Sequence, residues 1–540
     1  MSNLRKAIFL LLTFTFCLLN SFSQTAPAIQ WQNTFGGNST DWLNSINQAA
    51  DGGFICGGYS TSILSCDKTE NIIGFGDFWV VKLDSSGSIQ WQNTIGGMDI
   101  DYLQSMFNTN DGGYICGGSS SSNISGDKTE NSLGANDYWV VKLDSSGNIQ
   151  WQNTIGGSLS EAIWSIAQTA DGGYICGGNS NSDISGDKTE NSMGGSDYWV
   201  VKLNSAGAIQ WQNTIGGDST DYLNSISQTA DGGYICGGSS LSNISGDKTE
   251  NCIGGTDYWV VKLDSSGTIQ WQNTIGGNSY ESVFSVFQTP DGGYIIGGSS
   301  NSNISGDKTE NSQGLEDYWI VKLSSSGIIQ WQNTIGGNSG ETLRDTRQTS
   351  DGGYIMGGLS DSNISGDKTE NCLGGSDFWV IKLNASGNIQ WQNTIGGNGY
   401  DGLYSVTETN DGGYMLGGDS QSIISGDKTE NSCNNSTDFW VVRLYPDTIT
   451  GISDFEFRIS DFNISPNPLT SYSTLTFSNP LKNKFTFSLH DVTGRVVETV
   501  NTDGDKIVLE KGNKQAGVYL FNITNEKTGE RMNGKIIISD

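Results

Sequence analysis

The chain has 540 residues, of which 74 are glycine and only 6 are proline, and its formal net charge is −30. Hydrophobic residues make up 35% and aromatic residues 10%, which is enough for a packed core and argues against a disordered chain. Phosphate backbones would repel so negative a protein, so nucleic acid is excluded as an expected partner.

The first residues have the pattern of an export signal. Arg5 and Lys6 precede an apolar run over residues 7–19, and Ser21 and Ser23 stand at positions −3 and −1 of a cleavage site. The run is too short for a comfortable membrane span, and no other apolar stretch approaches the roughly 18 residues that a span needs. We therefore predict a signal peptide at residues 1–23 and no membrane span after its removal.

The rest of the chain is dominated by one repeated unit. The sequence WQNT recurs every 60 residues, beginning at Trp31, Trp91, Trp151, Trp211, Trp271, Trp331 and Trp391. Such regular self-similarity indicates one structural unit copied in tandem.

Each unit is expected to form four antiparallel strands. In the unit at residues 101–157, used below as the example unit, these strands are residues 102–109, 114–116, 138–143 and 149–155. Glycine-rich turns and one long polar loop separate them. Several strands are apolar on both faces, so neighbouring sheets must cover them. Sheets packed in this way around an axis form a β-propeller.

The two ends of the array predict how the propeller closes. The chain enters at Ile29 with a fourth strand, and the array stops at Leu444 after a third strand. The N-terminal strand can therefore complete the last sheet. The predicted fold is all-β: a seven-bladed β-propeller over residues 24–448 closed by its N-terminal strand, followed by a small C-terminal β-sandwich.

The repeat resembles a known family. It contains Gly-Gly followed by an acidic residue, then Asp-Gly-Gly-Tyr, then Asp-Tyr-Trp-Val-Val-Lys-Leu-Asp-Ser-Ser-Gly. This pattern resembles the seven-bladed β-propeller repeat of bacterial exported proteins and covers residues 29–445. The resemblance implies a propeller in an extracytoplasmic setting and implies no particular activity.

Cysteines in the array fall into two groups. One repeat position holds Cys56, Cys116, Cys176 and Cys236 in four units and Ile, Met or Leu in the later ones. Such a position is typical of a buried apolar site, so we expect free core thiols rather than bridges or metal ligands. The four remaining cysteines of the array lie in a loop, and the sequence predicts no pairing for them; they are Cys66, Cys252, Cys372 and Cys433.

Composition changes in residues 449–540, which we predict to be a linker and a C-terminal domain with its core at about 460–540. Its short strands favour a small β-sandwich. The segment resembles the type A C-terminal sorting domain of the type IX secretion system of Bacteroidetes. The residues that carry this resemblance are Pro466, Asn467, Pro468, Gly494, Arg495, Gly517, Tyr519 and Lys535. It implies contact with the type IX secretion machinery and a protein that is secreted or attached to the outer-membrane surface.

Charge is unevenly distributed over the two faces of the predicted propeller. The loops between strands two and three and between blades share one face, here named the broad face; the tight turns share the other. In the example unit the broad face holds five carboxylates and one lysine: Asp99, Asp101, Asp127, Lys128, Glu130 and Asp137. We expect this face to bind a glycan, a basic protein or divalent cations, with a merely solvated acidic surface as the alternative.

Calcium is the one cofactor that the sequence suggests. Asp127, Thr129 and Asn131 stand at alternate positions of the long loop, as in a calcium-binding loop. The central glycine is missing, and Tyr138 stands where a bidentate glutamate is needed.

Two further sets of residues are candidate ligand-binding positions. One acid per unit opens strand one, either at a shared entrance or hydrogen-bonded to backbone between blades: Asp41, Asp101, Glu161, Asp221, Glu281, Glu341 and Asp401. Three residues further along, the units differ, holding Asn44, Gln104, Trp164, Asn224, Phe284, Arg344 and Tyr404. These variable side chains, above all Trp164, Phe284, Arg344 and Tyr404, are expected to border the central channel and hold a sugar or peptide. The alternative is sequence drift at a water-filled channel that tolerates any side chain. One unit departs from the others at three neighbouring positions, Arg344, Asp345 and Arg347. A local salt bridge alone would account for this departure.

The sequence favours a non-enzymatic binding or adhesion protein at the cell surface. The only histidine, His490, lies in the predicted sorting domain, which removes histidine-based catalysis from the propeller. Sevenfold repetition gives the carboxylates similar environments, which argues against an acid/base pair. The alternatives are a secreted carbohydrate-active enzyme and a passive structural surface protein.

Overall fold

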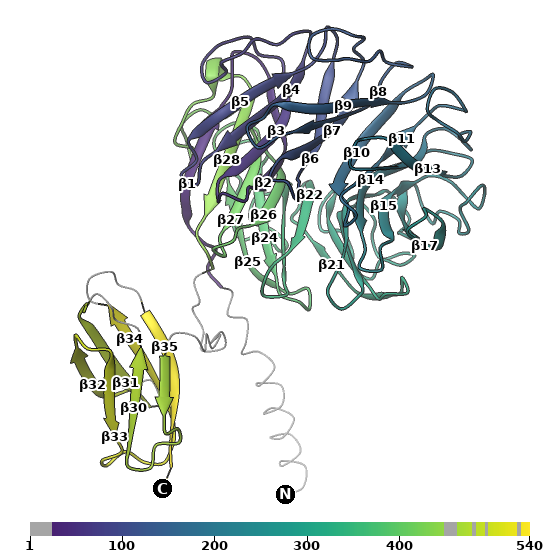
Figure 1. Cartoon of the computed structure of the whole chain (residues 1–540). Helices are drawn as coiled ribbons and strands as arrows, with labels where there is room; N and C mark the ends of the chain where they lie inside the picture. Colours follow the sequence, from purple (N-terminus) through teal and green to yellow (C-terminus); the bar gives the residue numbers. More distant parts are fainter. Residues whose placement is uncertain (1–23, 448–461, 478–481, 492–494, 526–530, 540) are drawn as a thin grey trace, which may run out of the picture. The chain divides into compact units, whose positions relative to one another are not determined.

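The computed structural model describes residues 24–447, 462–477, 482–491, 495–525 and 531–539 (Figure 1). The chain divides into two compact units, with the boundary between Thr448 and Ile449. The predicted signal peptide at residues 1–23 lies outside the described residues. No helix among the described residues is long and apolar enough to cross a membrane.

Six four-stranded antiparallel sheets, each made of consecutive strands, form the first six blades. Blade 1 contains β2 (Asp41–Gln48), β3 (Phe54–Ser60), β4 (Asp77–Leu83) and β5 (Ile89–Ile95). Blade 2 contains β6 (Asp101–Asn108), β7 (Tyr114–Ser120), β8 (Asp137–Leu143) and β9 (Ile149–Ile155). Blade 3 contains β10 (Glu161–Gln168), β11 (Tyr174–Ser180), β12 (Asp197–Leu203) and β13 (Ile209–Ile215). Blade 4 contains β14 (Asp221–Gln228), β15 (Tyr234–Ser240), β16 (Asp257–Leu263) and β17 (Ile269–Ile275). Blade 5 contains β18 (Glu281–Gln288), β19 (Tyr294–Ser300), β20 (Asp317–Leu323) and β21 (Ile329–Ile335). Blade 6 contains β22 (Glu341–Gln348), β23 (Tyr354–Ser360), β24 (Asp377–Leu383) and β25 (Ile389–Ile395).

The seventh blade is built from both ends of the array. Its strands are β26 (Asp401–Glu408), β27 (Tyr414–Ser420), β28 (Asp438–Leu444) and β1 (Ile29–Phe35). β1 pairs antiparallel with β28 from Ile29 opposite Leu444 to Phe35 opposite Phe439 (Figure 1). The predicted closure by the N-terminal strand is confirmed.

The blades form a ring because each innermost strand contacts the innermost strand of both neighbouring blades. The series returns to its start, since β2 contacts both β6 and β26. Apolar side chains fill each seam between blades; at the closing seam Leu43 and Trp79 of blade 1 pack with Phe439 and Val441 of blade 7. The predicted seven-bladed propeller is therefore confirmed.

A buried lysine anchors the long loop between strands two and three, as blade 2 shows. Lys128 Nζ donates to Thr154 Oγ1 at 2.6 Å and lies 5.1 Å from the centre of the Trp139 ring. Glu130 accepts the backbone N–H of Thr154 at 2.7 Å. Burial lowers the pKa of Lys128 to about 8, so this contact is made at a desolvation cost. The repeated loop sequence thus anchors the loop to strand four of its own blade.

The four core thiols are buried and free, as the sequence predicts. Among the loop cysteines, Cys66 of blade 1 and Cys433 of blade 7 form a disulfide, with their Cα atoms 6.4 Å apart. Cys433 begins the short 3₁₀ helix η1 (Cys433–Asn435). The disulfide therefore joins blade 1 to the C-terminal part of blade 7, across the same break in the chain that the pairing of β1 with β28 closes.

The position of this disulfide follows from the repeat. At other seams Cys66 is replaced by a glycine and Cys433 by a mostly apolar side chain of the preceding blade. A Cβ added to Gly126, for example, would lie 2.7 Å from Ile73 Cγ2, so glycine is required for that contact. At the closing seam a covalent bond takes the place of this close packing.

The second unit consists of two packed sheets. One contains β29 (Phe462–Ser465), β30 (Tyr472–Phe477) and β33 (Lys506–Glu510). The other contains β31 (Phe485–His490), β32 (Val496–Thr502), β34 (Gly517–Asn525) and β35 (Arg531–Ile538). Leu475 and Leu509 of the first sheet share a core with Phe487, Phe521 and Ile536 of the second, which is the packing of a small β-sandwich.

The residues of the predicted sorting motif occupy turns and strands of this sandwich. Pro466, Asn467 and Pro468 follow β29, and Asn467 accepts the backbone N–H of Ile537. Tyr519 of β34 donates to the Gln515 carbonyl at 3.0 Å. The remaining members lie in or beside strands as follows: Arg495 before β32, Gly517 at the start of β34 and Lys535 in β35. Gly494 lies outside the described residues.

We predict that the disulfide stabilises the propeller by preventing separation of blades 1 and 7. Replacing Cys66 and Cys433 with serine should cost about 2–4 kcal/mol and lower Tm by several degrees in thermal unfolding monitored by circular dichroism. Cys252→Ser with Cys372→Ser is the matched control, because Ser132 makes the equivalent bond in blade 2. Equal stability of the two double variants would contradict this role.

Candidate ligand-binding site

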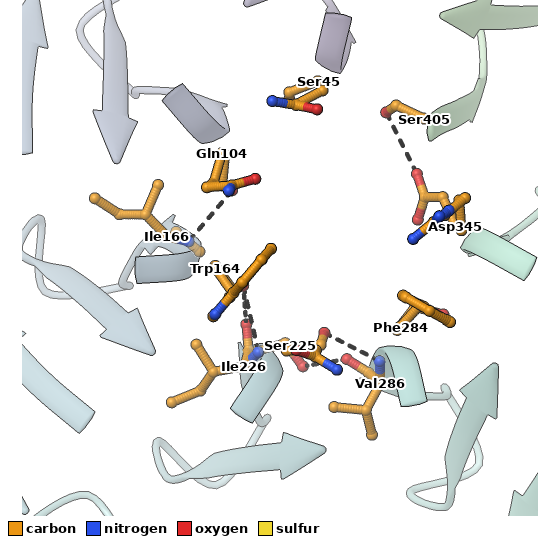
Figure 2. Close-up of a pocket in the computed structure, with 18 of the residues that line it drawn as sticks. Ser45, Gln104, Trp164, Ile166, Ser225, Ile226, Phe284, Val286, Asp345 and Ser405 are labelled. Carbon is orange, nitrogen blue, oxygen red and sulfur yellow. Dashed lines mark hydrogen bonds between the residues drawn. The ribbon is translucent and has the colours of Figure 1, made fainter. Parts of the chain in front are cut away.

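The seven innermost strands enclose a central cavity of about 370 Å³ (Figure 2). Figure 2 shows the side chains of Trp164 and Phe284 directed toward it. A cavity of this size is comparable with pockets that hold small molecules.

A β-bulge in each innermost strand positions the variable side chains. In β10, for example, pairing with β11 passes from Ile163 directly to Ser165 and leaves Trp164 unpaired. A bulge leaves one residue out of the ladder and redirects its side chain. All seven variable residues line the cavity: Asn44, Gln104, Trp164, Asn224, Phe284, Arg344 and Tyr404. The structure thus brings the residues at which the units differ most together around one cavity.

The residue after the bulge ties consecutive blades together. In blade 2 the hydroxyl of Ser105 accepts the backbone N–H of Ile166 at 3.3 Å. In blade 6 this serine is replaced by Asp345, which accepts the backbone N–H of Val406 at 3.1 Å and pairs with Arg347 at 3.2 Å. The salt bridge considered from the sequence therefore forms between Asp345 and Arg347, and Arg344 is not part of it.

Arg344 lies between two aromatic rings of the neighbouring blades. Its guanidinium carbon is 4.9 Å from the centre of the Phe284 ring and 5.4 Å from that of Tyr404. Stacking of this kind is favourable for a guanidinium and leaves its in-plane N–H donors free. Nε of Arg344 is buried and has no hydrogen-bond partner.

The other channel residues provide an aromatic surface and fixed amides. The Trp164 side chain is 40% exposed within the cavity wall. Asn44 and Asn224 each donate from Nδ2 to a backbone carbonyl of the next blade, to Leu103 and Val283 respectively, both at 2.7 Å. These bonds fix the amide groups in the wall.

The seven acids that open strand one do not form an entrance. All are fully buried: Asp41, Asp101, Glu161, Asp221, Glu281, Glu341 and Asp401. Asp41 accepts the backbone N–H of Gly37 at 2.7 Å and the hydroxyl of Ser62 at 2.9 Å. The assignment of these residues to ligand binding is corrected accordingly: they hydrogen-bond the connection between blades to a loop, which was the alternative interpretation.

Each of these acids lies beside a second buried carboxyl group of the preceding blade. The backbone N–H of Glu161 bonds the carbonyl of Asn136 at 2.8 Å, which places Glu161 beside Asp137. Burial, together with the charge of the neighbouring Glu161, raises the pKa of Asp137 to about 6. Oδ1 of Asp137 has no hydrogen-bond partner, and the buried Lys128 is the nearby cation. The pair is therefore costly to ionise fully.

The residues proposed as calcium ligands have other partners in the structure. Asp127 accepts the backbone N–H of Gly96 at 3.2 Å, and Asn131 Oδ1 accepts that of Ile124 at 3.1 Å. The backbone N–H of Thr129 donates to Gln152 at 3.2 Å. Among the described residues, no group of three acidic, histidine or cysteine side chains is arranged to hold a metal ion. The loop geometry is explained by these hydrogen bonds without a cation.

The broad face is less acidic and more apolar than its sequence suggests. In the example unit Asp101, Asp137 and Lys128 are buried, and their charges do not reach the surface. A ring of exposed aliphatic side chains, one per blade, occupies the long loops; its members are Leu64, Ile124, Ile184, Ile244, Ile304, Ile364 and Ile424. The free surface therefore mixes acidic and apolar groups.

Comparison with known families identifies the C-terminal unit. Residues 463–539 match the secretion system C-terminal sorting domain. This domain marks a protein exported through the type IX secretion system, and the chain is accordingly secreted or attached to the outer-membrane surface. No match was found among curated proteins.

Three solved structures are similar to the chain at low levels. A puromycin hydrolase mutant complexed with PGG shares 10% identity and a TM-score of 0.41, over 74% of this chain and 53% of that one. PorZ, a surface component of the type IX secretion system of Porphyromonas gingivalis, is 9% identical with a TM-score of 0.21, and the match covers 97% of this chain and 88% of PorZ. A family 32 glycoside hydrolase from Bifidobacterium adolescentis is 7% identical with a TM-score of 0.27, and the match covers 94% of this chain and 95% of the hydrolase. The chain spans about half the length of the puromycin hydrolase, and with TM-scores this low none of the three supports a functional argument.

The buried carboxyl pairs predict that the propeller loses stability as the pH rises. Since the pKa of Asp137 is about 6 in the folded state and 3.8 when unperturbed, the folded state retains protons that the unfolded state releases. Stability should fall between about pH 4 and pH 7, as measured by urea unfolding.

Asp137→Asn should reduce this dependence by the contribution of one pair and raise stability near pH 7 by about 1 kcal/mol, because an amide needs no ionisation. Asp183→Asn is the control, since Asp183 is exposed and Asn123 holds the equivalent position in blade 2. A rise in stability with pH over this range would contradict the assignment.

We also predict that the propeller does not depend on calcium. Removing divalent cations with a chelator, or adding millimolar calcium, should leave Tm unchanged within about 1 °C in differential scanning calorimetry. A calcium-dependent rise of several degrees that is lost in Asp127→Asn would show instead that the long loop binds the ion.

Proposed function

We propose that this chain is a non-enzymatic binding protein displayed at the cell surface, and that its ligand is a glycan held in the central channel. The observation that carries the proposal is the division of labour within the repeat. Residues that recur in every blade form hydrogen bonds, ion pairs and core contacts. The bulge residues, which differ most between blades, are brought together on the cavity wall.

The chemistry of the wall suits a sugar better than a purely apolar ligand. Trp164, Phe284 and Tyr404 offer flat aromatic faces, which pack well against the C–H faces of a sugar ring. Gln104 and Asn224, together with the serines that follow the bulges, supply polar groups for hydroxyls. A pocket with aromatic surface and a few fixed polar groups is typical of small-ligand sites.

The cavity offers little support for hydrolysis. Among the described residues that line it, Asp345 is the only carboxylate, and it is engaged by Val406, Ser405 and Arg347. Glycoside hydrolysis commonly requires two carboxyl groups on opposite sides of the bond. These facts favour binding without turnover over a carbohydrate-active enzyme.

A glycan array probed with the purified full chain tests this proposal. The chain should retain a defined set of glycans and release no new reducing ends from them. Trp164→Ala should weaken binding roughly fivefold to tenfold, because an aromatic contact contributes about 1 kcal/mol.

Phe75→Ala is the matched control for the array. Phe75 is an aromatic residue of a broad-face loop, 71% exposed and outside the cavity lining, so its loss should leave affinity unchanged. Release of product would favour the enzyme. If no glycan is retained and cells lacking the protein lose only surface integrity, the passive structural role is the better account.

A further inference from the structure

One cation stands out in the channel of this strongly acidic protein. The formal net charge of the chain is −30, yet the charged residues lining the cavity are Arg344, Arg347 and Asp345. Since Asp345 pairs with Arg347, their charges offset one another. The charge that remains on the wall is that of Arg344.

No ion pair within the described residues 24–447 satisfies Arg344. Asp419 and Glu316 are close enough to sense its charge, but neither lies within ion-pair distance. Asp419 is buried without a hydrogen-bond partner for either oxygen, and burial raises its pKa to about 8, so it is mainly neutral at pH 7. Among the described residues of the propeller, no carboxylate therefore lies within ion-pair distance of Arg344 to balance its charge.

The guanidinium is also held in a defined orientation. The ring centres of Phe284 and Tyr404, from the two flanking blades, lie 4.9 and 5.4 Å from the guanidinium carbon, so the side chain loses little further freedom on binding a ligand. The N–H groups at the edge of a stacked guanidinium match the two oxygens of a carboxylate. An oriented and uncompensated arginine in a cavity favours an anionic group with this planar geometry.

We propose that the channel binds a carboxylate carried on a sugar ring, such as a uronic acid, with Arg344, held between Phe284 and Tyr404, as the cation and Trp164 as the surface for the ring. This inference rests on the proposed function and names the class of glycan. A carboxylate at a peptide C-terminus offers the same oxygens, but the aromatic faces and the ring of serines fit a hydroxylated ring better.

Calorimetric titration of the full chain distinguishes these ligands. The probes are digalacturonate, the neutral disaccharide of the same linkage, and a short peptide with a free C-terminus. We expect digalacturonate to bind at least about tenfold more tightly than the neutral sugar and its affinity to fall with added salt.

Variants assign the effect to one side chain. Arg344→Gln should abolish the preference for digalacturonate, while Arg344→Lys, which keeps the charge but loses the planar fork, should retain part of it. Arg495→Gln is the control, because it removes the same charge from an exposed arginine of the C-terminal unit that does not line the cavity. Thermal unfolding shows whether each variant is folded.

The outcomes separate this inference from the broader function. Neutral glycans that bind in a Trp164-dependent way, with no effect of Arg344→Gln, would overturn the carboxylate site and leave glycan binding intact. Binding of the peptide but not of digalacturonate would overturn the sugar assignment. Absence of binding to any sugar would overturn both proposals.

Discussion

The antiparallel pairing of β1 with β28 is the interaction on which the rest of the structure depends. It joins Ile29–Phe35 to the last complete strand of the array, more than 400 residues later, and so converts a row of sheets into a ring. Only in a ring do the seven innermost strands share one channel and bring Trp164, Phe284 and Arg344 to one wall. The Cys66–Cys433 disulfide joins blade 1 to the C-terminal part of blade 7, and so bridges the same break in the chain that this pairing closes.

Much of the polar character of this chain serves the fold rather than a ligand. The buried Lys128 bonds a side chain in strand four of its own blade, whereas Asp137, Glu161 and Asp127 bond the backbone of a loop or of a connection between blades. Such groups are costly to bury, and they are tolerated because each bond fixes a loop or a connection in place on its own or the adjoining blade. Their sevenfold repetition makes them a property of the scaffold. The residues that escape repetition are the ones left to determine what the protein binds.

The architecture was largely predictable from sequence. The 60-residue period gives the number of blades, and the N-terminal strand that lacks the first three strands of a unit indicates how the ring closes. The sorting domain was predictable for a different reason, since several of its turn and strand residues stand together in the last 80 or so positions. The burial of Asp41 and its six equivalents was harder to predict, because a carboxylate at the start of a strand can face solvent or bind backbone N–H groups. Which of the two occurs depends on the path of the preceding connection between blades. The pairing of Cys66 with Cys433 was likewise hidden: it needs the knowledge that a glycine of one blade touches a side chain of the blade before it. The stacking of Arg344 depends on bulges, which shift register without a sequence signature of their own.

The closed ring is tested most directly by hydrogen exchange of the purified chain, followed by mass spectrometry. Amides of Ile29–Phe35 should be protected as strongly as those of the equivalent strand Ile89–Ile95 in blade 1, because both occupy the fourth position of a complete sheet. Rapid exchange throughout Ile29–Phe35, with protection retained in Ile89–Ile95, would mean that the ring is open and that the shared channel does not exist.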